Sequence, residues 1–379
     1  MTTAAVLPRH HAVGLGMQHG HALRVTTDAH EAWLQLCQDL DQARTAIHIC
    51  VYILADDAVG QRLRDRLIAA LARGVLVRLD LDAVGCLGLS QSLLRPLAAA
   101  GGEIYWFEPL GPHMLWLKRW WRRNHRKIVL IDSALAWVSG RNFTEQYYAL
   151  TPTAACWADV SARVTGPAVA DIARELAEKR RRPAKVGPPS QAPAEGEFLT
   201  VAFNRGGLRR ADANRRYLQA VRQAKQSIYL ANAYFLPQWA LERALTHAAR
   251  QGVRIYVTVP HPRISDVPLV GLASMHAVSR LLKRGIAVYA MRQTMLHAKI
   301  CTVDGHWWTL GSANLDPISR QRNLEANLVG LGAAPAAILQ QYQEELHKHA
   351  DLWTHERYLS LPRWRRALAA MAWLLRAFL

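Results

Sequence analysis

One stretch of this sequence occurs twice, and the duplication restricts the possible folds more than any other feature. Residues 124–142 read NHRKIVLIDSALAWVSGRN, and residues 296–314 read LHAKICTVDGHWWTLGSAN. Both copies follow the pattern H-x-K-x4-D, where x is any residue, and then place a small-residue pair and an asparagine at the same offsets. The interval between the copies is far longer than a solenoid repeat, so the sequence predicts two similar lobes.

The matched positions hold residue types that suit phosphate chemistry. The first copy supplies His125, Lys127, Asp132, Ser139-Gly140 and Asn142, and the second supplies His297, Lys299, Asp304, Gly311-Ser312 and Asn314. KIVLID and KICTVD have the composition of buried strands, in which residues i and i+2 face the same side. Each histidine is therefore expected to point into a cleft together with its lysine. The two aspartates precede turns, and the sequence leaves open whether they take part in chemistry or brace the strand ends.

Two such sets facing each other predict a site for phosphoryl transfer. A neutral imidazole can attack phosphorus or move a proton. A lysine ammonium and an asparagine amide can hold the non-bridging oxygens of a phosphate. Two lysines would supply the positive charge that a magnesium ion supplies in other phosphoryl-transfer sites, so we expect a site without a metal.

The order of apolar runs predicts an α/β fold. TAIHICVYIL (45–54) and VLVRLDLDAV (75–84) resemble strands with a helical stretch between them, and 226–237 and 253–260 repeat this order. Each lobe is therefore expected to be a sheet covered by helices. The predicted divisions are a flexible tail at 1–22, a first lobe at 23–180, a linker at 181–197, a second lobe at 198–360 and a basic, apolar helix at 361–379.

The two motifs resemble the paired HKD motifs of the phospholipase D superfamily. YFLP (234–237) and GSANLDPISRQRNLEANL (311–328) also resemble segments of the short bacterial cardiolipin synthases in that superfamily, and the likeness runs from about residue 24 to 360. The resemblance implies a bilobal fold with two pseudo-twofold related α-β-β-α-β-α-β-β lobes, whose mixed sheets are flanked by helices. It further implies one active site at the lobe interface, a covalent phosphohistidine intermediate, and neither metal nor other cofactor.

The same resemblance implies a role for each residue of the site. His125 is expected to be the nucleophile and His297 the general acid and base, and the catalytic set is completed by Lys127, Lys299, Asp132 and Asp304. Phosphate binding falls to Asn142, Ser312 and Asn314, and the acids that orient the histidines are Asp159 and Glu325. One departure is visible, because Ser139-Gly140 stands where the family more often has Gly-Gly or Gly-Ser.

Charge and tryptophan content favour a membrane surface as the partner. The formal net charge of +18 and the pI of about 10.2 indicate an anionic partner. Indoles and basic groups together suit the lipid headgroup region, although such surfaces also bind single-stranded nucleic acid. The predicted membrane contacts are Trp116, Lys118, Arg119, Trp120, Trp121, Arg122 and Arg123. The helix at 363–379 adds basic and apolar residues, and packing on the core is its alternative.

The implied function is cardiolipin synthesis from two phosphatidylglycerol molecules, with release of glycerol. The alternatives are phospholipid hydrolysis of the phospholipase D type and, less favoured, a metal-independent nuclease. The expected location is the cytoplasmic face of a bacterial inner membrane, with peripheral attachment and no spanning helix. The sequence leaves open the acceptor alcohol, the ratio of transfer to hydrolysis and the oligomeric state.

Overall fold

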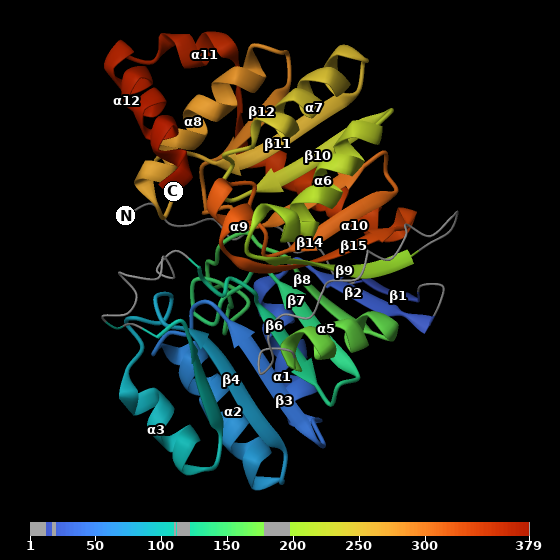
Figure 1. Ribbon diagram of the computed structural model, residues 1–379, viewed down its shortest axis with the longest axis vertical. Helices are drawn as coiled ribbons and strands as arrows, with labels where there is room; N and C mark the ends of the chain where they lie inside the picture. The colour runs from blue at the N-terminus through green and yellow to red at the C-terminus, as the bar shows by residue number, and fades with distance from the viewer. Residues whose placement is uncertain (1–12, 17–19, 110, 112–121, 178–197, 379) are drawn as a thin grey trace.

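The structure, a computed structural model, describes residues 13–16, 20–109, 111, 122–177 and 198–378, which form two lobes stacked on each other (Figure 1). The first lobe contains an eight-stranded sheet. Its strands are β1 (Val13–Gly16), β2 (Ala22–Thr26), β3 (Ala46–Val51), β4 (Leu76–Asp82), β5 (Glu103–Phe107), β6 (Ile128–Ile131), β7 (Leu135–Ser139) and β8 (Ser161–Thr165). Its helices are α1 (Ala29–Asp41), α2 (Ala58–Ala72), α3 (Gln91–Ala99) and α5 (Pro167–Ala177).

The second lobe contains another eight-stranded sheet. Its strands are β9 (Phe198–Arg205), β10 (Ser227–Asn232), β11 (Arg254–Pro260), β12 (Ala287–Met291), β13 (Lys299–Val303), β14 (Trp307–Gly311), β15 (Leu324–Leu331) and β16 (Ala350–Trp353). Its helices are α6 (Asp212–Gln223), α7 (Trp239–Arg250), α8 (Pro268–Leu282), α9 (Pro317–Gln321), α10 (Ala333–Lys348), α11 (His355–Ser360) and α12 (Arg363–Leu374). Two short 3₁₀ turns are η4 (Leu208–Arg210) and η5 (Leu375–Phe378).

The two sheets have the same strand order, so the duplication seen in the sequence extends to the sheet topology. The order β2-β8-β7-β6-β3-β4-β5 in the first sheet matches β9-β15-β14-β13-β10-β11-β12 in the second. Strands β3, β4 and β5 of the first sheet are parallel, as are β10, β11 and β12 of the second. The motif strands β6 and β13 are antiparallel to both of their neighbours. The predicted bilobal α/β fold with mixed sheets flanked by helices is confirmed.

Two details differ from the prediction. Within the described residues the first lobe, from β2 onward, follows β-α-β-α-β-α-β-β-β-β-α. The second lobe follows the same order with α9 inserted between β14 and β15 and with β16, α11 and α12 after α10, and both orders differ from the expected one. Strand β1 lies inside the segment predicted as a flexible tail and pairs with β2, so this edge of the first sheet begins earlier than expected. The predicted linker at 181–197 lies outside the described residues.

Local signals in the sequence account for the helix starts. The Asp28 side chain accepts a hydrogen bond from the Glu31 N–H at the start of α1, and Asp57 accepts from the Val59 and Gly60 N–H groups at the start of α2. Such caps satisfy amide groups that have no partner within the helix. Throughout the described parts of the chain, every helix is too short or too polar to cross a bilayer.

Hydrophobic packing joins the two lobes into one body. Helices α1 to α3 contribute to one cluster on the first sheet, and α6 to α8 contribute to another on the second. A third cluster includes β6 to β8 and α5 of the first lobe together with β13 to β15 and α10 of the second, and its members include Ile128, Ile172, Ile300 and Leu339. Because this cluster spans both lobes, burial of its apolar surface fixes one lobe against the other.

Asp132 and Asp304, which the resemblance placed in the catalytic set, instead brace the sheets. Asp132 follows β6, and its carboxylate accepts hydrogen bonds from the backbone N–H groups of residues 44, 45 and 46, which lead into β3. Asp304 follows β13 and accepts from the N–H groups of residues 225, 226 and 227 at the start of β10. Both have positive φ, 51° and 54°. Each aspartate lies at the far end of a strand from its histidine, and this separation excludes contact with the same phosphate.

Replacing either aspartate with asparagine is expected to lower stability. Asn tolerates the positive φ but presents an N–H₂ group to N–H donors, so we expect the free energy of unfolding to fall by about 1–3 kcal/mol. Partial burial opposes ionisation of Asp132, but its backbone hydrogen bonds hold the pKa below its usual value. The Asp132→Asn deficit should therefore be present above pH 4 and shrink as the pH falls further. Urea unfolding of both variants measures it.

Asp171→Asn is the matched control, because Asp171 forms an exposed ion pair with Arg174 on α5. This control should change stability by less than about 0.5 kcal/mol. Loss of catalytic turnover in Asp132→Asn or Asp304→Asn with stability intact would return these aspartates to the catalytic set.

Candidate active site

The two histidines lie where the lobes meet, and equivalent backbone contacts hold both. The His125 N–H donates to the Leu324 carbonyl over 2.9 Å, and the Leu324 N–H donates to the Arg123 carbonyl over 2.8 Å. In the other half the His297 N–H donates to Ala158 over 2.8 Å. Isolated parallel bridges join 124 with 324 and 158 with 296. Backbone hydrogen bonds therefore join each motif to the opposite lobe just before its strand, β6 or β13, begins.

Each histidine is bound by a carboxylate from the other lobe. His125 Nδ1 lies 3.0 and 3.1 Å from the two Glu325 carboxylate oxygens, and His297 Nδ1 lies 2.8 Å from Asp159 Oδ2. All four side chains are buried, with exposed fractions of 7% or less. A carboxylate on Nδ1 fixes the tautomer that leaves Nε2 as the reactive nitrogen. The predicted orienting acids thus both contact a histidine, and each acid contacts the histidine of the other lobe.

The two acids occupy equivalent places in the duplicated fold. Ser139 at the end of β7 pairs with Ser161, and Gly311 at the end of β14 pairs with Asn327. Asp159 and Glu325 each stand two residues before these partners. Strand alternation places both acids on the same face of their sheets as the paired residue, toward the opposite lobe.

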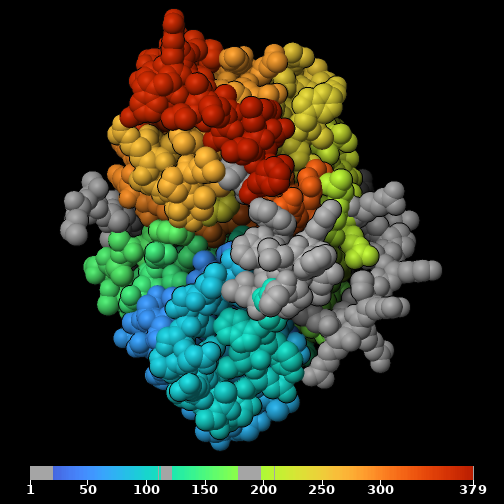
Figure 2. Space-filling view, turned by 60° about the vertical axis from the view of Figure 1, so that its left-hand side comes forward, coloured from blue at the N-terminus to red at the C-terminus, as the bar shows by residue number. Residues whose placement is uncertain are grey.

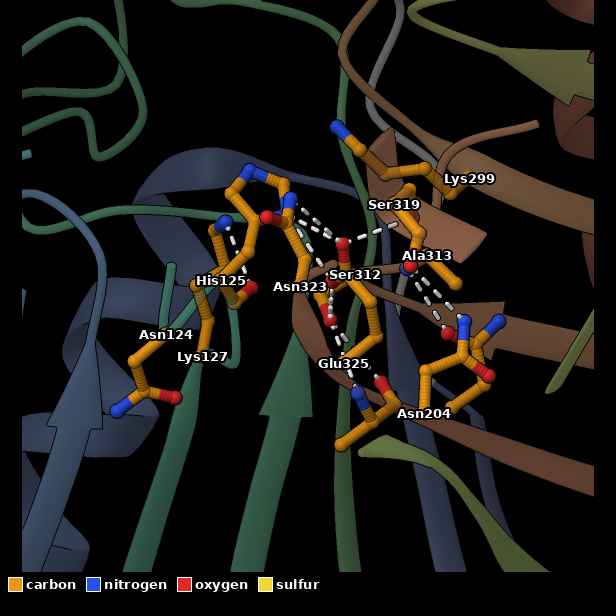
Figure 3. Close-up of polar contacts among 12 residues, drawn as sticks. Asn124, His125, Lys127, Asn204, Lys299, Ser312, Ala313, Ser319, Asn323 and Glu325 are labelled. Carbon is orange, nitrogen blue, oxygen red and sulfur yellow. Dashed lines mark hydrogen bonds and ion pairs between the residues drawn. The ribbon is translucent and has the colours of Figure 1, made fainter. Parts of the chain in front are cut away.

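Hydroxyl groups hold Glu325 in place, as Figure 3 shows. The Ser312 hydroxyl donates to Glu325 Oε2 over 2.6 Å, and the Ser319 hydroxyl donates to Oε1 over 2.8 Å. Ser312 Oγ in turn accepts from the Ala326 N–H. Ser312 was expected to bind phosphate, but its hydroxyl is committed to the carboxylate and it is fully buried. This contact corrects the prediction, because Ser312 positions Glu325.

The departure Ser139-Gly140 in the first motif has a steric cause. A β-carbon at Gly140 would lie 2.4 Å from Asp159 Oδ1, far inside contact distance. Gly140 occupies the position equivalent to Ser312. The second lobe has a hydroxyl at this position, and in the first lobe the missing side chain leaves room for the Asp159 carboxylate. The shorter first-lobe acid needs that space to approach the histidine.

Burial and the neighbouring lysines set the protonation of the histidines. Burial lowers the pKa of His125, and the Glu325 carboxylate opposes this effect. Burial and then the Lys299 ammonium lower the pKa of His297 to about 3. Lys299 Nζ lies 2.8 and 3.0 Å from the two ring nitrogens. Both imidazoles are therefore neutral at pH 7 in the protein alone.

Burial also lowers the pKa of both lysines. That of Lys299 falls to about 8, and that of Lys127 falls well below its ordinary value. Lys127 Nζ donates to the His125 carbonyl over 2.9 Å, and Lys299 donates to the His297 carbonyl. A phosphate anion placed beside these groups would favour their charged forms and raise the pKa of the histidines.

A cavity of about 420 Å³ opens onto both histidines. It is lined from both lobes, by Tyr52, Ile53, Val84, Arg123, His125, Asn142, Tyr147, Tyr234, Asp266, Val267, His297, Asn314, Asp316, Ile318 and Asn323. The predicted phosphate-binding asparagines 142 and 314 are thus both in the cavity wall. Asn142 Oδ1 accepts from the Ile53 N–H, and the Asn142 side chain also hydrogen-bonds that of Tyr147.

Several lining residues escaped the sequence prediction. The Tyr52 ring lies 5.0 Å from the ring of His125, and the Tyr147 ring lies 4.9 Å from that of His297. Asp316 is buried and belongs to the segment after the second motif, where the resemblance implies no role for this acid. Single aromatic or acidic residues in ordinary strands and turns carry no pattern that would have revealed them.

The predicted membrane contacts are only partly visible. Trp116, Lys118, Arg119, Trp120 and Trp121 lie outside the described residues. Arg122 is half exposed, with a guanidinium nitrogen 3.8 Å from Glu108. Arg123 differs from the prediction, because it is 7% exposed, lies 3.6 Å from Asp82 and lines the cavity. A side chain buried in this way faces the reacting groups and cannot lie on a bilayer.

Known proteins resemble this chain over most of its length. A family model described as cardiolipin synthase, PLD-like domain, matches residues 36–175 and 217–350, one segment in each lobe. Cardiolipin synthase B of Salmonella typhimurium is 34% identical over 328 residues, which cover 83% of this chain and 77% of that protein. Cardiolipin synthase B of Escherichia coli (strain K12) is 31% identical over 322 residues, covering 82% and 77%.

A solved structure shares the fold. The phosphatidylserine synthase of Haemophilus influenzae superposes with a TM-score of 0.77 and covers 97% of both chains. Its sequence is 14% identical, so the likeness concerns the fold alone.

Asp316 is expected to make stability depend on pH. Burial raises the pKa of its carboxyl to about 7, from an ordinary value of 3.8. Between these values the folded protein keeps a proton that the unfolded chain releases, so this group removes stability as the pH rises from about 4 to 7. Asp316→Asn cannot titrate and still caps α9, where Asp316 accepts from the Ser319 N–H.

Urea unfolding between pH 4 and 8 tests this expectation. The stability of Asp316→Asn relative to the native protein should rise across pH 4 to 7 and level off above pH 7. The same comparison for Asp171→Asn should be flat. A pH-independent difference for Asp316→Asn would show that the carboxyl ionises normally in the folded state.

Proposed function

The chain belongs to the family of cardiolipin synthases with PLD-like domains, and from that membership we propose that it transfers a phosphatidyl group between two phosphatidylglycerol molecules, giving cardiolipin and glycerol. The observation that carries the proposal is the crossed arrangement of the site, in which each lobe supplies one histidine and the acid for the other. Nδ1 of each histidine is bound by a carboxylate, and both imidazoles line one cavity, so one can act as nucleophile and the other as general acid on the same phosphorus, as a double displacement requires.

In the first step His125 Nε2 attacks the phosphorus of phosphatidylglycerol and the bond from phosphorus to the headgroup glycerol oxygen breaks. The product is a phosphatidyl-His125 intermediate. The bound phosphate anion offsets the lysine charges and raises the pKa of His297, so His297 takes up a proton from solvent as the substrate binds and donates it to the departing glycerol oxygen. Lys127, Lys299, Asn142 and Asn314 are the proposed donors to the non-bridging oxygens.

In the second step a headgroup hydroxyl of another phosphatidylglycerol gives its proton to His297 and attacks phosphorus. The bond from phosphorus to His125 breaks, so His125 is again neutral and His297 again carries the proton with which the first step began. Water in the acceptor's place would give phosphatidic acid instead. Burial of both histidines restricts water and supports transfer over hydrolysis.

The substrate is a membrane phospholipid, so we propose that the protein works at a bilayer surface. We place it peripherally on the cytoplasmic face of a bacterial inner membrane, with residues 361–379 as the proposed attachment helix. We also propose the lobe ranges 23–180 and 198–360, with strand β1 added to the first lobe.

Incubation with labelled phosphatidylglycerol vesicles tests the proposed reaction. Cardiolipin and glycerol should appear in equal amounts, with and without EDTA. His125→Ala and His297→Ala should each reduce turnover by at least about 10³-fold. His355→Ala, which alters a histidine at the start of α11, is the control and should leave turnover unchanged. Phosphatidic acid alone would identify a hydrolase, and no lipid turnover would direct attention to nucleic-acid substrates.

The assignment of the two histidines can be tested with a phosphatidyl ester of p-nitrophenol. This leaving group departs without a proton, so His297→Asn should still form the intermediate but lack the base for the second step. We expect a burst of one equivalent of p-nitrophenol from His297→Asn and none from His125→Asn. A burst from His125→Asn instead would exchange the two roles.

A further inference from the structure

The C-terminal segment carries an exposed apolar stripe. The side chains of Trp364, Leu368, Met371, Leu375 and Phe378 are 59%, 43%, 61%, 50% and 59% exposed. Their spacing of three or four residues places them on one side of α12 and η5. We call these five residues the C-terminal stripe. A contiguous exposed row of large apolar side chains indicates an interaction surface.

The opposite side of α12 is built to pack on the protein. Ala369 and Ala372 are buried, and Ala372 packs in a cluster with Val270, Ala273 and Ala277 of α8. Small residues allow the two helices to approach closely, and they leave the large side chains facing outward. One face of the helix therefore packs on the core, which was one of the two alternatives from the sequence, and the other face is left exposed.

The stripe leads to the rim of the cavity. Helix α8 begins at Pro268, directly after Asp266 and Val267 of the cavity wall, and α9 carries Ile318 of that wall. α12 packs on α8, and η5 contacts α9. In Figure 2 the red C-terminal segment runs over the second lobe toward the boundary between the lobes. Val267 and Leu269 add exposed apolar side chains at this rim, 38% and 42% exposed.

Charge identifies the kind of surface that would cover this stripe. Residues 357–379 contain five arginines and no aspartate or glutamate. Arg363 and Arg365 are exposed beside Trp364, and Arg365 lies 5.1 Å from its ring. Large apolar side chains flanked by arginines match the boundary between acyl chains and anionic headgroups of a bilayer.

We propose that the C-terminal stripe and the exposed start of α8 form one face that lies in an anionic phospholipid bilayer, so that headgroups reach the cavity from the membrane plane. This inference rests on the proposed function for its lipid substrate. It adds which face of the proposed attachment helix meets the membrane, the start of α8 as part of that face, and the side from which the substrate enters. A lipid can then present its phosphate to the histidines while its acyl chains stay in the bilayer.

The test compares two substrates and matched variants. Met371→Gln and Leu368→Gln/Met371→Gln remove apolar character without adding charge, and glutamine is compatible with a helix. Leu76→Gln is the control, because Leu76 is 74% exposed at the end of β4 distant from the cavity. Each protein is assayed for binding to phosphatidylglycerol vesicles by flotation and for turnover of those vesicles. Turnover is also measured on short-chain phosphatidylglycerol below its micelle-forming concentration.

We expect the double variant to bind vesicles about tenfold less and to turn them over about tenfold more slowly. Its turnover of the monomeric short-chain lipid should stay within about twofold, and Leu76→Gln should behave as the native protein. Unchanged vesicle binding would overturn the proposal, as would a parallel loss on the monomeric lipid. A native dimer that Met371→Gln converts to a monomer, with vesicle binding intact, would assign the stripe to a second copy of the chain.

Vesicle binding does not require catalysis, so the two proposals fail separately. A native protein that binds vesicles through the stripe but converts no phosphatidylglycerol would refute the proposed reaction and leave the membrane face supported.

Discussion

The pairing of each histidine with a carboxylate of the opposite lobe is the constraint on which the rest of the structure depends. Imidazoles buried in this way are useful only if one ring nitrogen is held and the other is free. Glu325 and Asp159 meet this need from across the interface, at 3.0 and 2.8 Å. Neither lobe contains a complete site, so the fold must bring both together and keep them in register.

The register comes from backbone contacts and from shared burial. The same type of strand bridge precedes both histidines, and a hydrophobic cluster with members in both lobes fixes the interface. Buried charges need partners to be tolerated, and the pairs His125–Glu325 and His297–Asp159 provide them. Burial lowers the pKa of both lysines, and a bound phosphate would raise it again by favouring the charged ammonium groups. The site is thus arranged for an anion that completes its charge balance.

The surface near the cavity suits a substrate that stays in a membrane. The catalytic groups lie between the lobes at the base of the cavity. Helices α8 and α9 begin at this cavity, and the C-terminal segment packs on them. The exposed apolar side chains and arginines of that segment lie on the side of α12 away from α8. A phosphodiester at the level of the headgroups is within reach of such an arrangement, whereas a fully dissolved substrate would need no such face.

The sequence by itself determined the two-lobed α/β fold and the paired His-Lys sets, because a repeated pattern and strand alternation are local properties of the chain. The two orienting acids were predicted from the resemblance to a known family. Only the tertiary structure decided which acid serves which histidine, since those partners lie 200 and 138 residues apart. It also showed that Asp132 and Asp304 accept hydrogen bonds from the segments leading into β3 and β10, that Ser312 donates to Glu325, and that Arg123 lines the cavity. Spacing gives the direction of a side chain, but its neighbour depends on how separate segments pack.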